Sequence, residues 1–425
     1  GAAGYDAIAP AWLACYKRAY LMKSVRPFPA LERDSDVLLG SELPNYRTAE
    51  RANVVGELSM RGWIGLIEPW PFMLGRELAG VFAVREWSSL GGNGIVRFRG
   101  RLLVDSETAM SLLMPRLEPY GYVPMIENSE EITLIRHSSP SAESKSTGKG
   151  WLVNLVLFLA TLATTLLVGA MMEGAQPLHD PRALLLGVPF SASLLLILGF
   201  HELGHYLTAR AYGVQVSLPY FVPLPLPPMG TMGAIIRMRS PIPNRKVLLD
   251  IGIAGPLSGL VLAIPILAIG LMLSPVKPQS GLVLQEGNSL AYLALKWLVK
   301  GPIPEGHDVF LHPMALAGWL GLFVTALNLM PLSQLDGGHI AYAALGRNYR
   351  KVVWLFLGTL VLLYLIARWE GWLVWVALAA GLGLRHPPPL DDLTPLDPPR
   401  RILAVVALVL LLTLIMPLPF DVHEF

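Results

Sequence analysis

The sequence predicts a mainly α protein, a polytopic transmembrane helical bundle with a re-entrant or β-hairpin segment, plus a small N-terminal α+β soluble domain. Of the 425 residues, 53% are hydrophobic and 15% are charged, and the mean hydropathy is +0.51, which is too apolar for a soluble globular protein. The apolar residues are concentrated after residue 150, in several stretches long enough to span a bilayer. Before that point, residues 94–136 contain short segments with the alternating pattern of strands.

Charge and cysteine content exclude several classes of protein. The formal net charge is +2, and no basic stripe with interleaved aromatic residues is present, so we expect no nucleic-acid partner. The single cysteine, Cys15, cannot form an internal disulfide framework or a cysteine-based zinc site. Any metal ligands must therefore come from His, Asp and Glu.

The first 150 residues divide into three regions. Residues 1–92 form a soluble region of uncertain fold, and residues 138–150 have the polar composition of a flexible linker. Between them, residues 93–137 predict a small α+β domain. Its expected elements are a strand or hairpin over Gly94–Val104, a helix over Glu107–Pro119 capped by Asp105 or Ser106, and strands over Tyr122–Ile126 and Glu131–Arg136.

Residues 151–425 predict a transmembrane domain with about seven spans. The expected spans are Trp151–Met172, Ala183–Gly213, Val247–Leu273, Met314–Leu332, Val352–Ala367, Trp372–Leu384 and Ile402–Leu418, of which the sixth is short. A further helix over Ser289–Val299 is expected in the polar connection between the third and fourth spans. The distribution of Lys and Arg favours a cytoplasmic N-terminus and an external C-terminus.

Two features of the spans affect how the backbone can pack. Residues 214–245 are apolar but rich in proline, and backbone of this kind cannot expose unpaired amides to lipid, so it should lie against the bundle or line a wet cavity. Within this stretch, Gly233–Arg239 is expected to offer an exposed strand edge. In the next span, Gly252, Gly255 and Gly259 allow close helix packing.

A His-Glu-x-x-His pattern at 201–205 lies inside one of the most apolar parts of the chain. On a helix, His201 and His205 project from the same face, one turn apart, which suits two ligands to one zinc ion. Glu202 then lies beside the metal, where it can take a proton from a bound water. Ionisable groups at membrane depth are costly and indicate a functional site, whereas the simpler interpretation is a chance match with two hydrogen-bonded histidines.

The third ligand is predicted in the stretch Asn328-Leu-Met-Pro-Leu-Ser-Gln-Leu-Asp-Gly-Gly-His339. Asp336 lies at the end of an apolar span, where a carboxylate needs a partner or a metal. The glycines after it let the backbone turn closely, and Pro331 breaks the helix beside Asn328. In the alternative interpretation Asp336 only caps the next helix. No role can be argued for His339 from the sequence, because it could support the site or be purely structural.

Together, these two motifs resemble those of the site-two protease family of intramembrane zinc proteases. The resemblance covers about residues 151–345, including Gly-Thr-Met-Gly at 230–233 and Gly255-Pro256. The small N-terminal domain and the lack of an evident PDZ domain look more like the bacterial, archaeal and chloroplast branch, which is related to the plant chloroplast members. The resemblance implies one Zn²⁺ held by His201, His205 and Asp336, with Glu202 as the catalytic glutamate and Asn328 helping to position substrate or stabilise the oxyanion.

The function implied is zinc-dependent endoproteolysis of transmembrane segments in single-span membrane proteins, as in regulated intramembrane proteolysis. The alternatives are a membrane zinc transporter and a metal-binding scaffold without proteolysis. We expect an integral membrane protein of the bacterial inner membrane with its active site toward the cytoplasm, and archaeal and thylakoid membranes are the other options. The oligomeric state is not indicated.

Overall fold

The computed structural model describes residues 70–89, 94–136, 150–177, 179–278, 282–382 and 386–424. Predictions for residues 1–69 and for the linker up to residue 149 lie outside this part of the chain. The chain forms two compact units, Gly1–Ser139 and Pro140–Phe425, and each is described by itself.

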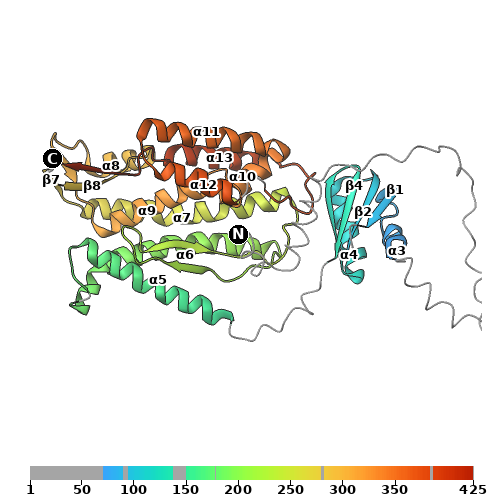
Figure 1. The fold of residues 1–425 in the computed structure, drawn as a ribbon, viewed down its shortest axis with the longest axis horizontal. Helices are drawn as coiled ribbons and strands as arrows, with labels where there is room; N and C mark the ends of the chain where they lie inside the picture. The colour runs from blue at the N-terminus through green and yellow to red at the C-terminus, as the bar shows by residue number, and fades with distance from the viewer. Residues whose placement is uncertain are drawn as a thin grey trace, which may run out of the picture. The chain divides into compact units, whose positions relative to one another are not determined.

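The described part of the N-terminal unit is an antiparallel sheet in the order β1-β2-β4-β3 with two helices, α3 and α4 (Figure 1). Asp105 caps α4 by accepting a hydrogen bond from the backbone amide of Thr108 at 2.9 Å, as its sequence position predicts. Phe98, Leu113 and Ile132 are fully buried between the sheet and the helices. The elements are α3 (Trp70–Glu77), β1 (Phe82–Ser89), β2 (Ile95–Leu102), α4 (Ser106–Leu117), β3 (Tyr122–Asn128) and β4 (Glu131–Arg136).

The predicted helix and the last two strands are confirmed, and two details differ from expectation. The hairpin alternative for Gly94–Val104 is wrong, because β2 is one continuous strand that pairs with both β1 and β4. The fold of this unit also includes helix α3 and strand β1, which precede the predicted start at residue 93 and had no clear period in the sequence.

The second unit is built mainly of helices that lie alongside one another (Figure 1). In the described residues, four stretches are long and apolar enough to cross a membrane: Gly150–Met172, Pro181–Ala211, Arg245–Leu273 and Asp336–Ala367. The chain is a multi-pass membrane protein, and the total of seven spans stays a prediction. The helices are α5 (Gly150–Met172), α6 (Val188–Ala211), α7 (Arg245–Leu273), α8 (Leu290–Lys300), α9 (Pro313–Asn328), α10 (Asp336–Leu345), α11 (Tyr349–Ala367), α12 (Gly371–Leu382) and α13 (Pro398–Leu414).

Backbone pairing joins segments far apart in sequence at each end of the helical unit. The C-terminal strand β10 (Phe420–Glu424) pairs with β8 (Leu282–Glu286), in the connection between α7 and α9. Near the start of α7, Leu390 donates its amide to the Ile242 carbonyl and Asp391 donates to that of Pro243. The segment between α12 and α13 therefore returns to the end of the unit where α7 begins.

The proline-rich stretch forms the expected hairpin. Strand β5 (Tyr220–Pro223) pairs antiparallel with β6 (Thr231–Ile235), and α5 packs beside them. Gly230 has a positive φ of 73°, and a Cβ there would lie 2.9 Å from the Thr165 Cα on α5, so this turn requires glycine. Among the described residues β6 pairs with β5 alone, which leaves its other edge open.

A buried ionic network holds the connection between α7 and α9. Helix α8, predicted over Ser289–Val299 and capped by Ser289, carries Lys296 in a buried position. The Lys296 ammonium lies 2.8 Å from the Asp308 carboxylate and 3.4 Å from that of Glu286. Burial alone would raise the pKa of Asp308, but its hydrogen bonds to Lys296 and to the Val309 amide outweigh that effect and hold the pKa below 3.8.

We expect Lys296→Met to lower the free energy of unfolding by about 3–5 kcal/mol, because it leaves two carboxylates in a partly buried site without their cation. The measurement is thermal or denaturant unfolding of the purified protein in detergent. Because the folded state lowers the pKa of Asp308, this contribution is present at neutral pH and disappears as the pH falls below 3.8. Lys277→Met is the control, since Lys277 is exposed, and an equal loss in both variants would contradict the prediction.

Candidate metal centre

Helix α6 brings the two histidines of the His-Glu-x-x-His pattern to one point. Their Nε2 atoms lie 3.2 Å apart, as the spacing of four residues on a helix predicts. His201, Glu202 and His205 are all buried, with 5–6% of each residue exposed. They are therefore withdrawn from solvent within a helix whose remaining residues are mainly apolar.

Asp336 reaches the same point from the broken helix between α9 and α10. Asp336 Oδ2 lies 3.2 Å from His201 Nε2, and its Oδ1 lies 3.2 Å from His205 Nε2. Helix α9 ends at Asn328, and α10 begins at Asp336 itself, with Leu335 in the cap position and no side-chain cap. The carboxylate is thus directed to the histidines instead of capping its own helix.

Two glycines make this turn possible. A Cβ at Gly337 would lie 1.9 Å from the Leu329 carbonyl oxygen, and one at Gly338 would lie 2.4 Å from that of Ser333. Ser333 itself has a φ of 44°, a left-handed conformation that is strained for a residue with a side chain. The predicted close turn around Asp336 is confirmed.

The three side chains fit a tetrahedral zinc site. Ligand atoms about 2.0–2.1 Å from zinc in a tetrahedral arrangement lie roughly 3.3–3.4 Å from one another. The measured separations of 3.2 Å between the two Nε2 atoms, and between each of them and an Asp336 oxygen, match this spacing. Two imidazoles and one carboxylate leave a fourth position for water, as in catalytic zinc sites.

A backbone carbonyl fixes the tautomer of His205. His205 Nδ1 lies 2.7 Å from the carbonyl oxygen of Ile251 on α7. A carbonyl can only accept a hydrogen bond, so the Nδ1 position carries the proton and Nε2 is the nitrogen directed at Asp336, where it can bind a metal in the neutral imidazole. Outer contacts of this kind orient metal-bound histidines in zinc enzymes.

The other two predicted residues lie beside the three ligand side chains. Asn328 Nδ2 is 3.2 Å from His201 Nε2, at the last residue of α9. The Glu202 side chain lies near the backbone of Ile236, the residue that follows β6. The structure therefore brings together all five residues that the two sequence motifs predict, and it places them next to the open-edged strand.

Comparison with known proteins agrees with this geometry. Residues 189–365, which include both motifs, match the model of peptidase family M50. This segment of the chain therefore belongs to peptidase family M50, the site-two protease family.

Three curated relatives of the chain are plant proteins. It is 31% identical over 301 residues to a protein named probable zinc metalloprotease EGY1, chloroplastic, of Arabidopsis thaliana, an alignment covering 64% of this chain and 54% of the relative. It is 33% identical over 242 residues to Arabidopsis EGY2 (55% and 42%) and 33% identical over 293 residues to EGY3 of Oryza sativa subsp. indica (63% and 48%). The chain thus spans about half the length of these relatives.

Helix α7 packs against the M50 site through the glycines that the sequence singled out. A Cβ at Gly255 would lie 2.0 Å from His205 Nε2, and one at Gly259 would lie 3.3 Å from the His201 Cβ. A Cβ at Gly252 would lie 3.3 Å from the Asp336 carbonyl oxygen. All three glycines therefore give space to the residues that carry the ligand groups.

Three contacts of the M50 site were not predicted. The Ile251 carbonyl is a backbone group and has no signal in the sequence. His339, for which the sequence supported no role, lies with its Nδ1 2.6 Å from Nε2 of His386, and His386 stacks on Tyr342 of α10. His386 comes from the proline-rich segment after α12, 47 residues away, and only the folded chain shows that it reaches α10.

We expect Gly255→Ala to lower zinc affinity by at least about tenfold, the size of effect seen when the support of a metal ligand is lost. The added methyl would occupy the space of the His205 ring, so either the ring or α7 must move. Chelator competition on the purified protein measures this. Gly358→Ala is the matched control, because a Cβ there meets nothing within 4 Å, and zinc affinity like that of the control would contradict the prediction.

Proposed function

We propose that this protein is a zinc-dependent intramembrane endopeptidase that cleaves transmembrane segments of membrane proteins. The observation that supports this most directly is the meeting of His201, His205 and Asp336 at 3.2 Å separations, with Glu202 on the same helix. Buried ionisable groups of this kind are costly at membrane depth, and a bound cation would compensate the Asp336 charge. A purely structural zinc site would have no use for Glu202 or for an open fourth position.

The proposed chemistry is hydrolysis of a peptide bond. His201, His205 and Asp336 would hold the zinc ion, which would supply Lewis acidity and activate the attacking water. Glu202 accepts the proton of the attacking water and later delivers it to the leaving amine, as the C–O bond forms and the C–N bond breaks. The Asn328 amide, close to His201, can donate a hydrogen bond to the oxyanion that develops on the carbonyl oxygen.

The open edge of β6 suggests how a substrate is held. A transmembrane helix has all of its amides paired, so it must unwind locally before it can be cut. An unwound segment can add a strand to the free edge of β6 through main-chain hydrogen bonds. The residue after β6, Ile236, contacts Glu202, so a strand added there would run past the proposed base. Single-span membrane proteins are the proposed substrates.

The compartment is part of this proposal. The distribution of Lys and Arg supports a site near the cytoplasmic or equivalent side of the membrane. The relatives are chloroplast proteins by name, which favours a plastid membrane over the bacterial inner membrane that we expected from the sequence.

We expect Glu202→Gln to lower the cleavage rate by about 10²–10⁴-fold while zinc stays bound, because the variant keeps the ligands and loses the base. The assay follows cleavage of a panel of single-span peptides in detergent or liposomes, with zinc measured on the same samples. Glu173→Gln, which changes an exposed carboxylate after α5, should behave like the wild type. Unchanged cleavage by Glu202→Gln would rule out the mechanism. Zinc flux without cleavage would indicate the transporter.

A further inference from the structure

The segment between α12 and α13 touches each helix that carries or orients a proposed zinc ligand. We call its described residues together with the first three residues of α13, 386–400, the buttress. They lie beyond the residues that match the family model, which end at 365. His386 contacts His339 on α10, and Leu390 and Asp391 hydrogen-bond to the two residues before Asn244, the N-cap of α7. The last residue of the buttress, Arg400, contacts α7 and the end of α6.

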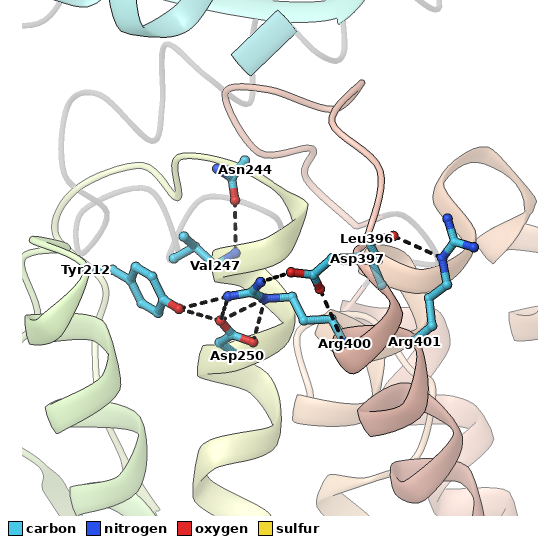
Figure 2. A network of polar contacts seen from close by, with 8 residues as sticks. All are labelled: Tyr212, Asn244, Val247, Asp250, Leu396, Asp397, Arg400 and Arg401. Atoms are coloured by element: carbon cyan, nitrogen blue, oxygen red, sulfur yellow. Dashed lines mark hydrogen bonds and ion pairs between the residues drawn. The ribbon is translucent and has the colours of Figure 1, made fainter. Parts of the chain in front are cut away.

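Arg400 forms a two-pronged ion pair with Asp250 of α7 (Figure 2). Its Nε lies 3.0 Å from both Asp250 oxygens, and its Nη2 lies 2.6 Å from Oδ2. Asp397 accepts a hydrogen bond from Nη1, so a second carboxylate holds the guanidinium in place. The side chains of Arg400 and Asp250 are 22% and 15% exposed, so water screens this pair less than a surface pair.

The Arg400–Asp250 ion pair also contacts the end of α6. The Tyr212 hydroxyl donates a hydrogen bond to Asp250 Oδ2 at 2.5 Å and accepts one from Arg400 Nη2 at 3.1 Å. Tyr212 is the C-cap residue of α6, directly after the helix that carries His201 and His205. Figure 2 shows these side chains converging from α6, α7 and α13.

Asp250 is directly followed by Ile251, whose carbonyl accepts the Nδ1 proton of His205. A shift or rotation of α7 at Asp250 would therefore move this carbonyl as well. Bidentate guanidinium–carboxylate contacts fix direction as well as distance, so Arg400 can define the rotation of α7 at this level.

We propose that Arg400 is a positioning residue for the zinc site. Its ion pair with Asp250 sets the position of the Ile251 carbonyl, and that carbonyl holds the His205 ring in the orientation and tautomer that bind the metal. This inference rests on the proposed function, because it takes His205 to be a zinc ligand. In this proposal the buttress orients a zinc ligand, in addition to packing α13 against the other helices.

A fastening role and a positioning role have different consequences. If Arg400 only fastens α13, its removal lowers the melting temperature and leaves the zinc affinity of the folded protein unchanged. If Arg400 positions His205, its removal also weakens zinc binding well below the melting temperature. It would also change the absorption spectrum of Co²⁺ bound in place of zinc, because that spectrum reports ligand geometry.

The test compares Arg400→Gln with Arg401→Gln in the full chain, purified in detergent. Arg401 is the matched control, because it is the next residue on α13 and its Nε donates to the Leu396 carbonyl within the same segment (Figure 2). Zinc affinity is measured by chelator competition, and the Co²⁺ spectrum is recorded on the same variants. Both measurements are made at least about 20 °C below the melting temperature of each variant, because the folded state is then dominant.

We expect Arg400→Gln to weaken zinc binding by about 10–100-fold and to shift the Co²⁺ spectrum, with Arg401→Gln like the wild type. Wild-type affinity and spectrum in folded Arg400→Gln would overturn the proposal. If that variant does not fold, Arg400→Lys decides, because it keeps the charge and loses the two-pronged contact: weaker zinc binding supports positioning, and unchanged binding overturns it. A wild type that binds no zinc would overturn the proposed function itself.

Discussion

Three ionisable side chains meeting at membrane depth are the constraint on which the rest of the helical unit depends. Two imidazoles and a carboxylate 3.2 Å apart are expensive to bury unless a cation or a network of hydrogen bonds compensates them. The fold therefore has to bring α6 and the start of α10 together closely and hold their side chains in one orientation. The glycines of α7, the turn before Asp336 and the contacts around Asp250 all serve this requirement.

Close packing and orientation are provided by different groups. Glycines remove bulk where a ligand residue faces a neighbouring helix, as Gly255 does against the His205 ring. The orientation of the His205 ring comes from a polar contact, the hydrogen bond that the Ile251 carbonyl accepts from it. In our proposal the Arg400–Asp250 ion pair supports this contact, because Asp250 directly precedes Ile251. Because α7 takes part in both, it is the central helix of the site although it supplies no ligand. In the proposed function, the open edge of β6 would bring a substrate strand to the side where Glu202 lies.

Most of the site could be predicted from the sequence because its groups carry strong local signals. His201, Glu202 and His205 follow a helical spacing within an apolar run, and Asp336 follows a helix-breaking proline and precedes two glycines. The remaining contacts have no such signal. Every residue has a backbone carbonyl, so the sequence cannot single out that of Ile251. Arg400 pairs with Asp250 across 150 residues, a separation at which the sequence gives no signal. Similarly, β1 has no alternating pattern, since seven of its eight residues are exposed, so only the folded sheet identifies it.

The most direct test of the central claim is zinc content and cleavage, measured together in the wild type and in Asp336→Ala. The account predicts about one zinc per wild-type chain, as a single three-ligand site requires, with both metal and cleavage of single-span substrates lost in the variant. Zinc retained at full occupancy without Asp336 would contradict the three-ligand site. Cleavage retained without Asp336 would contradict the proposal that this site carries the activity.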